Sequence, residues 1–100
     1  MLKMDSYIDD KYAILDETLL TITNPEETLV IPHEVNGHRI KRIANGLFVG
    51  TNVKTIIISE GITEIGAEAF AGTDNLEKLI LPESLKVLGS DSFLRYERTV

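Results

Sequence analysis

Three short runs of the chain consist of consecutive aliphatic residues. The segments "LVIP" (29–32), "IIIS" (56–59) and "LILP" (79–82) each hold three aliphatic residues and end in proline or serine. A period of two places the first and third side chains on one side of a strand and the second on the other. The runs therefore predict three strands with one buried side, each ended by a residue that interrupts the sheet.

A second apolar pattern follows each of these strands. It lies in the segments 40–50, 62–72 and 85–95. Its phenylalanines, Phe48, Phe70 and Phe93, are 22 and 23 residues apart, and the apolar residues five positions earlier keep the same steps. A fixed period of this length is typical of proteins built from stacked repeats. We expect the phenylalanines to form a core column, with Gly66 and Gly89 allowing the tight backbone beside it.

The first repeat carries an insertion that predicts a hairpin. Nine positions separate Ile31 from Ile40, where the later repeats use four. The extra residues centre on Asn-Gly, the strongest short signal for a two-residue hairpin turn. A turn at 36–37 would set Glu34 opposite Arg39, an exposed ion pair worth at most about 1 kcal/mol.

These residues resemble the BspA-like leucine-rich repeats of bacterial surface proteins and other bacterial chains. The pattern of that family is L-x-x-L-x-L-P-x-x-L-x-x-I-G-x-x-A-F, and the resemblance covers residues 29–93. It is carried best by "VKTIIISEGITEIGAEAF" (53–70) and "LEKLILPESLKVLGSDSF" (76–93). The chain departs from it at Ser59 in place of proline, at Leu47 and Ser92 in place of alanine, and in lacking the usual cysteine after phenylalanine.

The repeats and the resemblance together predict one domain, residues 1–100. Its class is a β-rich α/β solenoid, and the resemblance implies a short right-handed leucine-rich-repeat coil of about three repeats. We place the repeats at 29–52, 53–75 and 76–100. Ahead of them, "YAILDETLLTITN" (12–24) predicts two strands around Asp16–Glu17. This hairpin would form an N-terminal cap within residues 1–28.

The composition excludes most site chemistry. The chain has no cysteine, which removes disulfides, thiolate nucleophiles and zinc sites built on cysteine. His33 and His38 would share a face of the predicted hairpin, but no third ligand stands at a supporting spacing. No phosphate-binding glycine loop or catalytic triad motif occurs. We therefore expect neither enzyme activity nor a cofactor or metal.

The charge and hydropathy of the chain limit the classes of partner that we expect it to bind. The net charge is −6, which disfavours direct binding to nucleic acid, although residues 35–58 hold four bases and no acid. No apolar run reaches the ~18 residues needed to cross a bilayer, and the start resembles no signal peptide. As written, the chain is expected in the cytoplasm without a membrane partner. It would be at the surface or secreted if it belongs to a larger family member.

The outward positions of the predicted strands form the candidate binding surface. Val30, Ile57 and Ile80 occupy the same outward position in three successive strands. The polar residues beside them are Lys54, Thr55, Glu77 and Lys78. An aliphatic centre with a polar rim is typical of an interface with another protein. The sequence leaves open whether the N-terminal segment covers this column.

These features favour a non-catalytic module that binds a protein partner. One alternative is a small acidic inhibitor of a host nucleic-acid-binding enzyme, of the kind mobile elements carry. Another is the N-terminal fragment of a larger repeat surface protein, as the resemblance suggests. The end of the coil would need a cover, because repeats expose apolar surface at their ends. A homodimer through Phe93, Leu94 and Tyr96 would supply one.

Overall fold

The computed structural model describes residues 5–23, 27–49, 51–73 and 75–90. Every regular element in these ranges is a β-strand, so the helical part of the predicted α/β class has no counterpart there. The segments 45–49 and 67–72, where repeats of mixed class would carry a helix, are runs of turns. Each includes a glycine at positive φ, Gly46 at 66° and Gly72 at 72°, a conformation that stops helix propagation.

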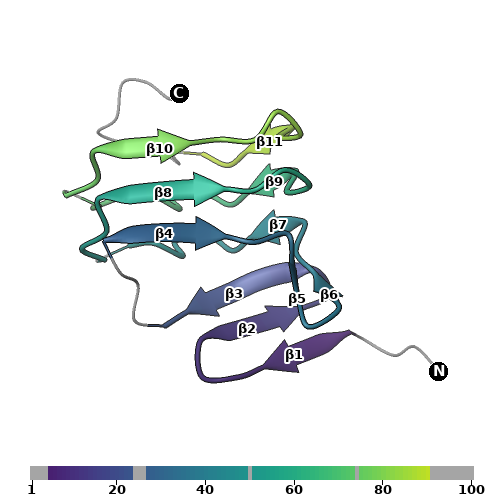
Figure 1. The fold of residues 1–100 in the computed structure, drawn as a ribbon. Helices are drawn as coiled ribbons and strands as arrows, with labels where there is room; N and C mark the ends of the chain where they lie inside the picture. Colours follow the sequence, from purple (N-terminus) through teal and green to yellow (C-terminus); the bar gives the residue numbers. More distant parts are fainter. Residues whose placement is uncertain (1–4, 24–26, 50, 74, 91–100) are drawn as a thin grey trace.

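The first strand of each repeat joins a parallel three-stranded sheet. Its members are β4 (Thr28–Ile31), β8 (Thr55–Ile58) and β10 (Lys78–Ile80), in the order β10-β8-β4 (Figure 1). Leu29, Ile56 and Leu79 are paired across the three strands and are buried. The alternation predicted from the sequence therefore sets which side of this sheet faces the core.

The second strand of each repeat joins a six-stranded sheet, ordered β1-β2-β3-β7-β9-β11. Its parallel part consists of β7 (Arg42–Ile43), β9 (Glu64–Ile65) and β11 (Val87–Leu88). Backbone bonds at the start of these strands run in one direction. The N–H of Lys41 donates to Glu17 O, that of Thr63 to Lys41 O, and that of Lys86 to Thr63 O, each at 2.8 Å. At this position, a backbone N–H of each described repeat donates a hydrogen bond to a carbonyl of the segment before it.

The N-terminal segment forms three antiparallel strands rather than the two predicted. These are β1 (Ser6–Ile8), β2 (Tyr12–Leu15) and β3 (Thr18–Ile22). The predicted turn joins β2 to β3, with Asp16 and Glu17 at φ 50° and 66°, as a type I′ turn requires. Strand β3 then pairs in parallel with β7, so the meander continues directly into the repeat sheet (Figure 1).

The insertion in the first repeat forms the predicted hairpin. Strands β5 (Glu34–Val35) and β6 (His38–Arg39) pair with Glu34 opposite Arg39. The turn residues Asn36 and Gly37 have φ of 50° and 85°. Within the described residues, Glu34 and Arg39 do not approach to ion-pair distance. The turn chemistry therefore determines the register without help from that pair.

The core lies between the two sheets. Phe48 and Phe70 are fully buried and stack with ring centroids 5.1 Å apart at an interplanar angle of 7°. The column predicted from the sequence is thus present for these two, while Phe93 lies outside the described residues. Thr73 is also fully buried, and its Oγ1 donates to Phe70 O at 2.6 Å. Thr51 makes the equivalent bond to Phe48 O at 3.0 Å.

Gly66 and Gly89 lie where consecutive repeats approach most closely. A Cβ on Gly66 would lie 2.6 Å from Asn45 N and 2.8 Å from Ile43 O. A Cβ on Gly89 would lie 2.6 Å from Ala67 Cα. These distances are shorter than van der Waals contact and involve backbone atoms, which cannot move aside alone. Glycine is therefore required here by space between the repeats.

Candidate functional site

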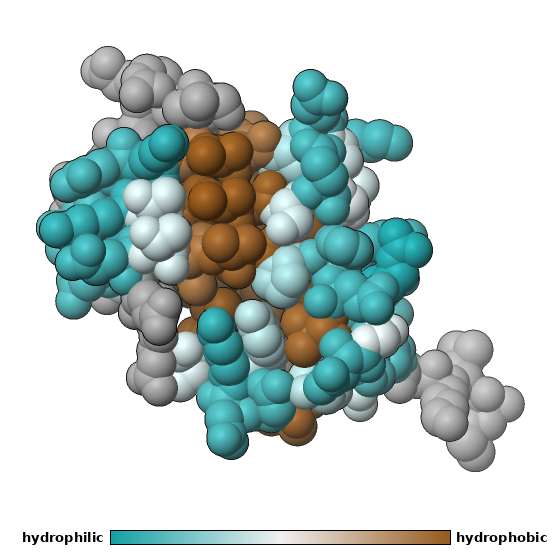
Figure 2. All heavy atoms as spheres, in the orientation of Figure 1, coloured by the Kyte–Doolittle hydropathy of each residue, from teal (hydrophilic) through white to brown (hydrophobic). Residues whose placement is uncertain are grey.

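The outer face of the three-stranded sheet carries an apolar strip formed by Val30, Ile57 and Ile80. The three residues are paired in register across β4, β8 and β10. Figure 2 shows the hydrophobic strip running across this sheet between polar surfaces. Val30 is 50% exposed, and Ile57 and Ile80 are partly exposed. The described N-terminal segment leaves the strip open to solvent.

Val30 is the most exposed residue of the strip. Ile57 lies on the central strand, with Val30 on one side and Ile80 on the other, and these neighbours shield it from water on both sides. Val30 and Ile80 both lie on edge strands, β4 and β10, and each has such a neighbour on one side only. Ile80 is nevertheless less exposed than Val30, so the strip is most accessible at its N-terminal end for reasons beyond strand order.

Polar residues flank the strip in two further columns. Thr55 pairs with Thr28 and Lys78, and the main chain of Lys54 bonds to those of Glu27 and Glu77 at 2.8 Å each. The charged members of these columns are exposed, and Lys54 Nζ lies 3.7 Å from Glu27 Oε2. The rim predicted from the sequence thus gains two members, Glu27 and Thr28, that sequence reasoning did not include. Their signal was the same spacing relative to Val30.

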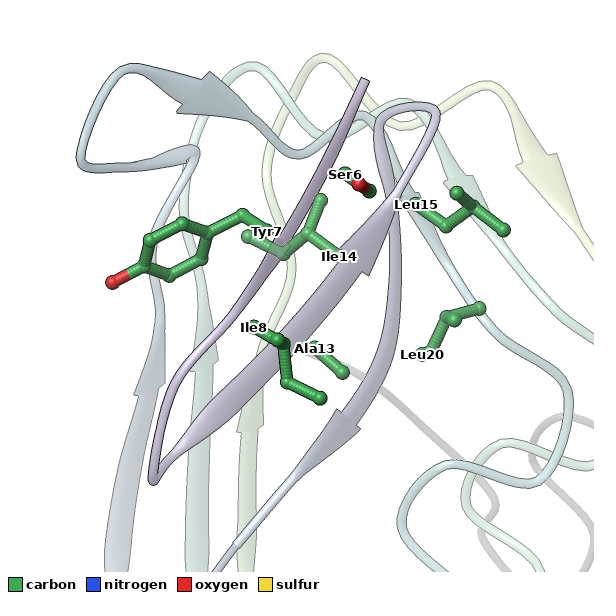
Figure 3. Close-up of a pocket in the computed structure, with 7 residues that line it drawn as sticks. All are labelled: Ser6, Tyr7, Ile8, Ala13, Ile14, Leu15 and Leu20. Carbon is green, nitrogen blue, oxygen red and sulfur yellow. The ribbon is translucent and has the colours of Figure 1, made fainter. Parts of the chain in front are cut away.

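A concave surface lies on the N-terminal meander. It is a pocket of about 320 Å³ whose lining comes from β1, β2 and β3 (Figure 3). The lining residues are Ser6, Tyr7, Ile8, Ala13, Ile14, Leu15 and Leu20. Ile8 is 79% exposed and Leu20 is 45% exposed, values unusual for large aliphatic side chains. This pocket was not predicted from the sequence, because strand β1 was not predicted.

A polar cluster joins the insertion hairpin to β1. The ring of His38 stacks on that of Tyr7 with centroids 5.0 Å apart, and His38 Nδ1 lies 2.8 Å from Asp5 Oδ1. Asn36 Nδ2 donates to the Tyr7 hydroxyl at 2.6 Å. No group of three or more His, Cys, Asp or Glu residues within the described ranges is arranged to hold a metal. The stacked rings and the two side-chain contacts connect the hairpin to the N-terminal segment.

Asp9 organises the turn between β1 and β2. Its carboxylate accepts the N–H groups of Lys11 at 2.8 Å and Tyr12 at 2.7 Å, and the Tyr7 hydroxyl at 2.7 Å. The bond from the Tyr12 backbone, followed by that from Tyr7, lowers the pKa of Asp9 below its ordinary value. The bond to Asp9 raises the pKa of Tyr7, with a smaller effect from desolvation. Near neutral pH Asp9 is ionised and Tyr7 is protonated, and these are the forms in which the bonds of the turn are made.

Comparison with known proteins agrees with this geometry. The description "BspA type Leucine rich repeat region (6 copies)" matches residues 16–99. A leucine-rich cell surface protein from Faecalibacterium prausnitzii A2-165 has a similar structure, with a TM-score of 0.75 and 22% sequence identity. The match covers 89% of this chain and 27% of that one. No curated protein matches the chain in sequence.

The two findings differ in what they establish. Similarity at 22% identity shows a shared fold, and the chain spans about a quarter of the length of the surface protein. Within the described ranges there is no helix long and apolar enough to span a membrane. The family match extends over most of the sequence and confirms the resemblance seen in its motifs. The chain belongs to the BspA-type leucine-rich repeat family.

Proposed function

We propose that this chain is a non-catalytic module that binds a protein partner through the outer face of its three-stranded sheet. The observation that carries the proposal is the in-register strip of Val30, Ile57 and Ile80 with charged columns beside it. An apolar centre within a polar rim excludes water where contacts are energetically important and keeps the free surface soluble. Repeat proteins commonly use such extended surfaces for binding.

The proposed architecture is a right-handed solenoid of about three repeats. Residues 1–28 would cap it, and the repeats would occupy 29–52, 53–75 and 76–100. Support comes from the two sheets, in which each described repeat contributes one parallel strand to each sheet. In this arrangement each repeat adds one aliphatic residue to the strip. A partner that covers more of the strip would therefore contact more repeats.

The strip alone is too small to form a stable interface. A specific complex buries about 800 Å² on each partner, which corresponds to roughly 20–30 residues. The proposed partner-binding set therefore includes the rim residues Lys54, Thr55, Glu77 and Lys78. Because these charges lie at the edge of the contact, we expect them to affect association rate and salt dependence more than final affinity.

The test compares two arginine double variants of the chain. In Ile57→Arg/Ile80→Arg the charges lie in the strip, and in Val49→Arg/Val87→Arg they replace exposed aliphatic residues elsewhere. Both should keep the far-UV spectrum and melting temperature of wild type. A partner captured from host lysate should bind wild type and the second variant but not the first. Equal capture by the strip variant would contradict the proposed surface.

A salt titration of the captured complex separates the proposal from the acidic-inhibitor alternative. Binding through the strip should tolerate salt, because burial of apolar surface is only weakly screened. Binding of the acidic surfaces to a basic enzyme should instead weaken steeply with ionic strength. A complex that dissociates in salt and ignores the strip substitutions would favour the inhibitor.

A second candidate role is suggested by the similar surface protein. That chain is several times longer than the segment matched here, so this sequence corresponds in size to part of a larger repeat protein. We propose a surface location for that case. The alternative of a homodimer through Phe93, Leu94 and Tyr96 concerns residues outside the described ranges. Sedimentation velocity tests the homodimer, since a concentration-independent monomer would exclude it, and a stable monomer would also weaken the fragment alternative.

A further inference from the structure

One edge of strand β1 has no partner strand among the described residues. The strand pairs with β2 on one side and is the outermost strand of the six-stranded sheet. Asp9 N donates to Tyr12 O and Asp16 N donates to Asp5 O, so odd-numbered residues of β1 are directed toward β2. Antiparallel pairing alternates, which turns the N–H and C=O groups of Ser6 and Ile8 to the open edge. Two donors and two acceptors therefore face outward within the described structure.

The pocket of Figure 3 lies on the meander, and Ser6 and Ile8 of this edge strand form part of its lining. Ser6 pairs with Leu15 and Ile8 pairs with Ala13, so two small residues lie between the large ones. The hollow exists because Ala13 and Ser6 do not fill the space between Ile8, Leu15 and Leu20. A strand added at the edge of β1 would place alternate side chains next to Ile8 and over this hollow.

Acidic residues lie at both ends of the edge. Asp5 and Asp16 are adjacent at one end, and Asp9 and Asp10 lie at the other. Lys11 lies beside Asp9 and Asp10 in the turn, and His38 Nδ1 lies 2.8 Å from Asp5 Oδ1, so acidic side chains outnumber basic ones along the described edge. Two copies of β1 paired about Tyr7 would place Asp5 opposite Asp9 twice, and like charges in opposed positions are destabilising. The charge pattern therefore disfavours a second copy and suits a basic strand.

We propose that the edge of β1 binds an extended peptide segment that has aliphatic residues at alternating positions and basic residues at its ends. The backbone of the segment would pair with Ser6 and Ile8. Its aliphatic side chains would enter the pocket beside Ile8, and its basic ends would meet the aspartates. This site uses different residues from the apolar strip, so a test of one proposal does not affect the other.

The test uses acetyl-Lys-Leu-Thr-Leu-Lys-amide as the probe and the ¹⁵N-labelled full chain. The two leucines lie on one face of an extended peptide, as the pocket requires. We expect dose-dependent shifts of the Ser6 and Ile8 amide resonances that weaken as NaCl is raised from about 50 to about 500 mM. The matched peptide with glutamate in place of both lysines should bind at least about tenfold more weakly.

Variants of the protein locate the peptide. Ala13→Leu fills the pocket on an exposed face, and Ser6→Pro removes one outward N–H without touching the bonds to β2. Each should weaken binding at least about tenfold while leaving the melting temperature near that of wild type. Val49→Ser removes an exposed aliphatic side chain elsewhere and should change nothing. Should Ser6→Pro fail to fold, Ala13→Leu still decides.

Three results would overturn the proposal. The first is the absence of shifts at β1 with millimolar peptide, or equal binding by Ala13→Leu. The second is equal binding of the glutamate peptide, which would remove the charge argument. The third is a concentration-dependent shift of the Ser6 and Ile8 resonances without peptide, accompanied by dimer in sedimentation. That result would make a second copy of the chain the occupant of the edge.

Discussion

Substituting Gly66 by alanine should destabilise this protein far more than the same change at Gly37. The new methyl group at Gly66 would lie 2.6 Å from Asn45 N and 2.8 Å from Ile43 O, both backbone atoms of the preceding repeat. A methyl group at Gly37 would meet no atom within 4 Å, so only the backbone strain of φ +85° arises there. Comparing Gly66→Ala with Gly37→Ala therefore separates the cost of steric overlap between repeats from the cost of a positive φ.

The expected magnitude follows from these contacts. Overpacking against fixed atoms costs about 1–3 kcal/mol. Separating the repeats also weakens the bonds from Gly66 N to Ile43 O and from Ala67 N to Asn45 Oδ1, both 2.8 Å, each worth about 1 kcal/mol. The total is about 3–5 kcal/mol, a large share of the ~5–15 kcal/mol of a domain this size. Gly37→Ala should cost about 1–2 kcal/mol.

Urea unfolding followed by far-UV circular dichroism measures both changes, because two-state curves with equal slopes give the difference in free energy directly. The variant Asn45→Ala provides the control. It removes the amide side chain near Gly66 but leaves the backbone atoms in place, so it should not rescue Gly66→Ala. If Asn45→Ala restores most of the lost stability, or if the two glycine variants are equally stable, the spacing argument is wrong.

Three further outcomes are expected. Phe70→Ala removes half of the stacked pair and should cost about 3–5 kcal/mol in urea unfolding, while Phe70→Leu should cost less. Thr73→Val should cost about 1 kcal/mol because the 2.6 Å bond from Thr73 Oγ1 to Phe70 O is lost while the longer bond from Thr73 N is kept, and Thr73→Ser should retain most stability. The pKa of Asp9 is lowered in the folded state, so its contribution is fully present above pH ~4 and is lost as the pH falls through that lowered value. Melting temperatures should therefore fall in acid more for wild type than for Asp9→Asn, and ultraviolet titration of that variant should show Tyr7 ionising at lower pH than in wild type.

Local alternation and spacing were sufficient to predict much of this fold. The columns that contain Ile56 and Phe70 follow from a two-residue and a 22-residue period, and the hairpin follows from Asn36–Gly37. These features are local or strictly repeated, so one sequence contains enough information about them. The α component was expected from the fold class, whereas turns that include glycine at positive φ occupy those segments.

The features that were missed depend on contacts between distant segments. Strand β1 has only three residues between aspartates, too few to show alternation, and it is a strand because β2 pairs with it. The pocket beside it could not be predicted without that strand. The sequence likewise placed Val30 and Ile57 in one column, but the greater exposure of Val30 depends on the neighbours that each side chain meets in the folded chain.

The one-directional backbone bonds at the start of β7, β9 and β11 have a consequence for how such chains change in length. At these strands each repeat takes its hydrogen-bond acceptors from the segment before it, from Glu17 through Lys41 to Thr63. Removing one whole period, residues 44–65, would bring the donors of the following repeat onto an equivalent set of acceptors. Removing half a period would turn apolar side chains toward water and leave donors without partners. Outside surface insertions such as the hairpin of residues 34–39, an insertion or deletion that keeps these bonds is therefore expected to comprise a complete repeat, with Glu17 O of the N-terminal meander as the first acceptor.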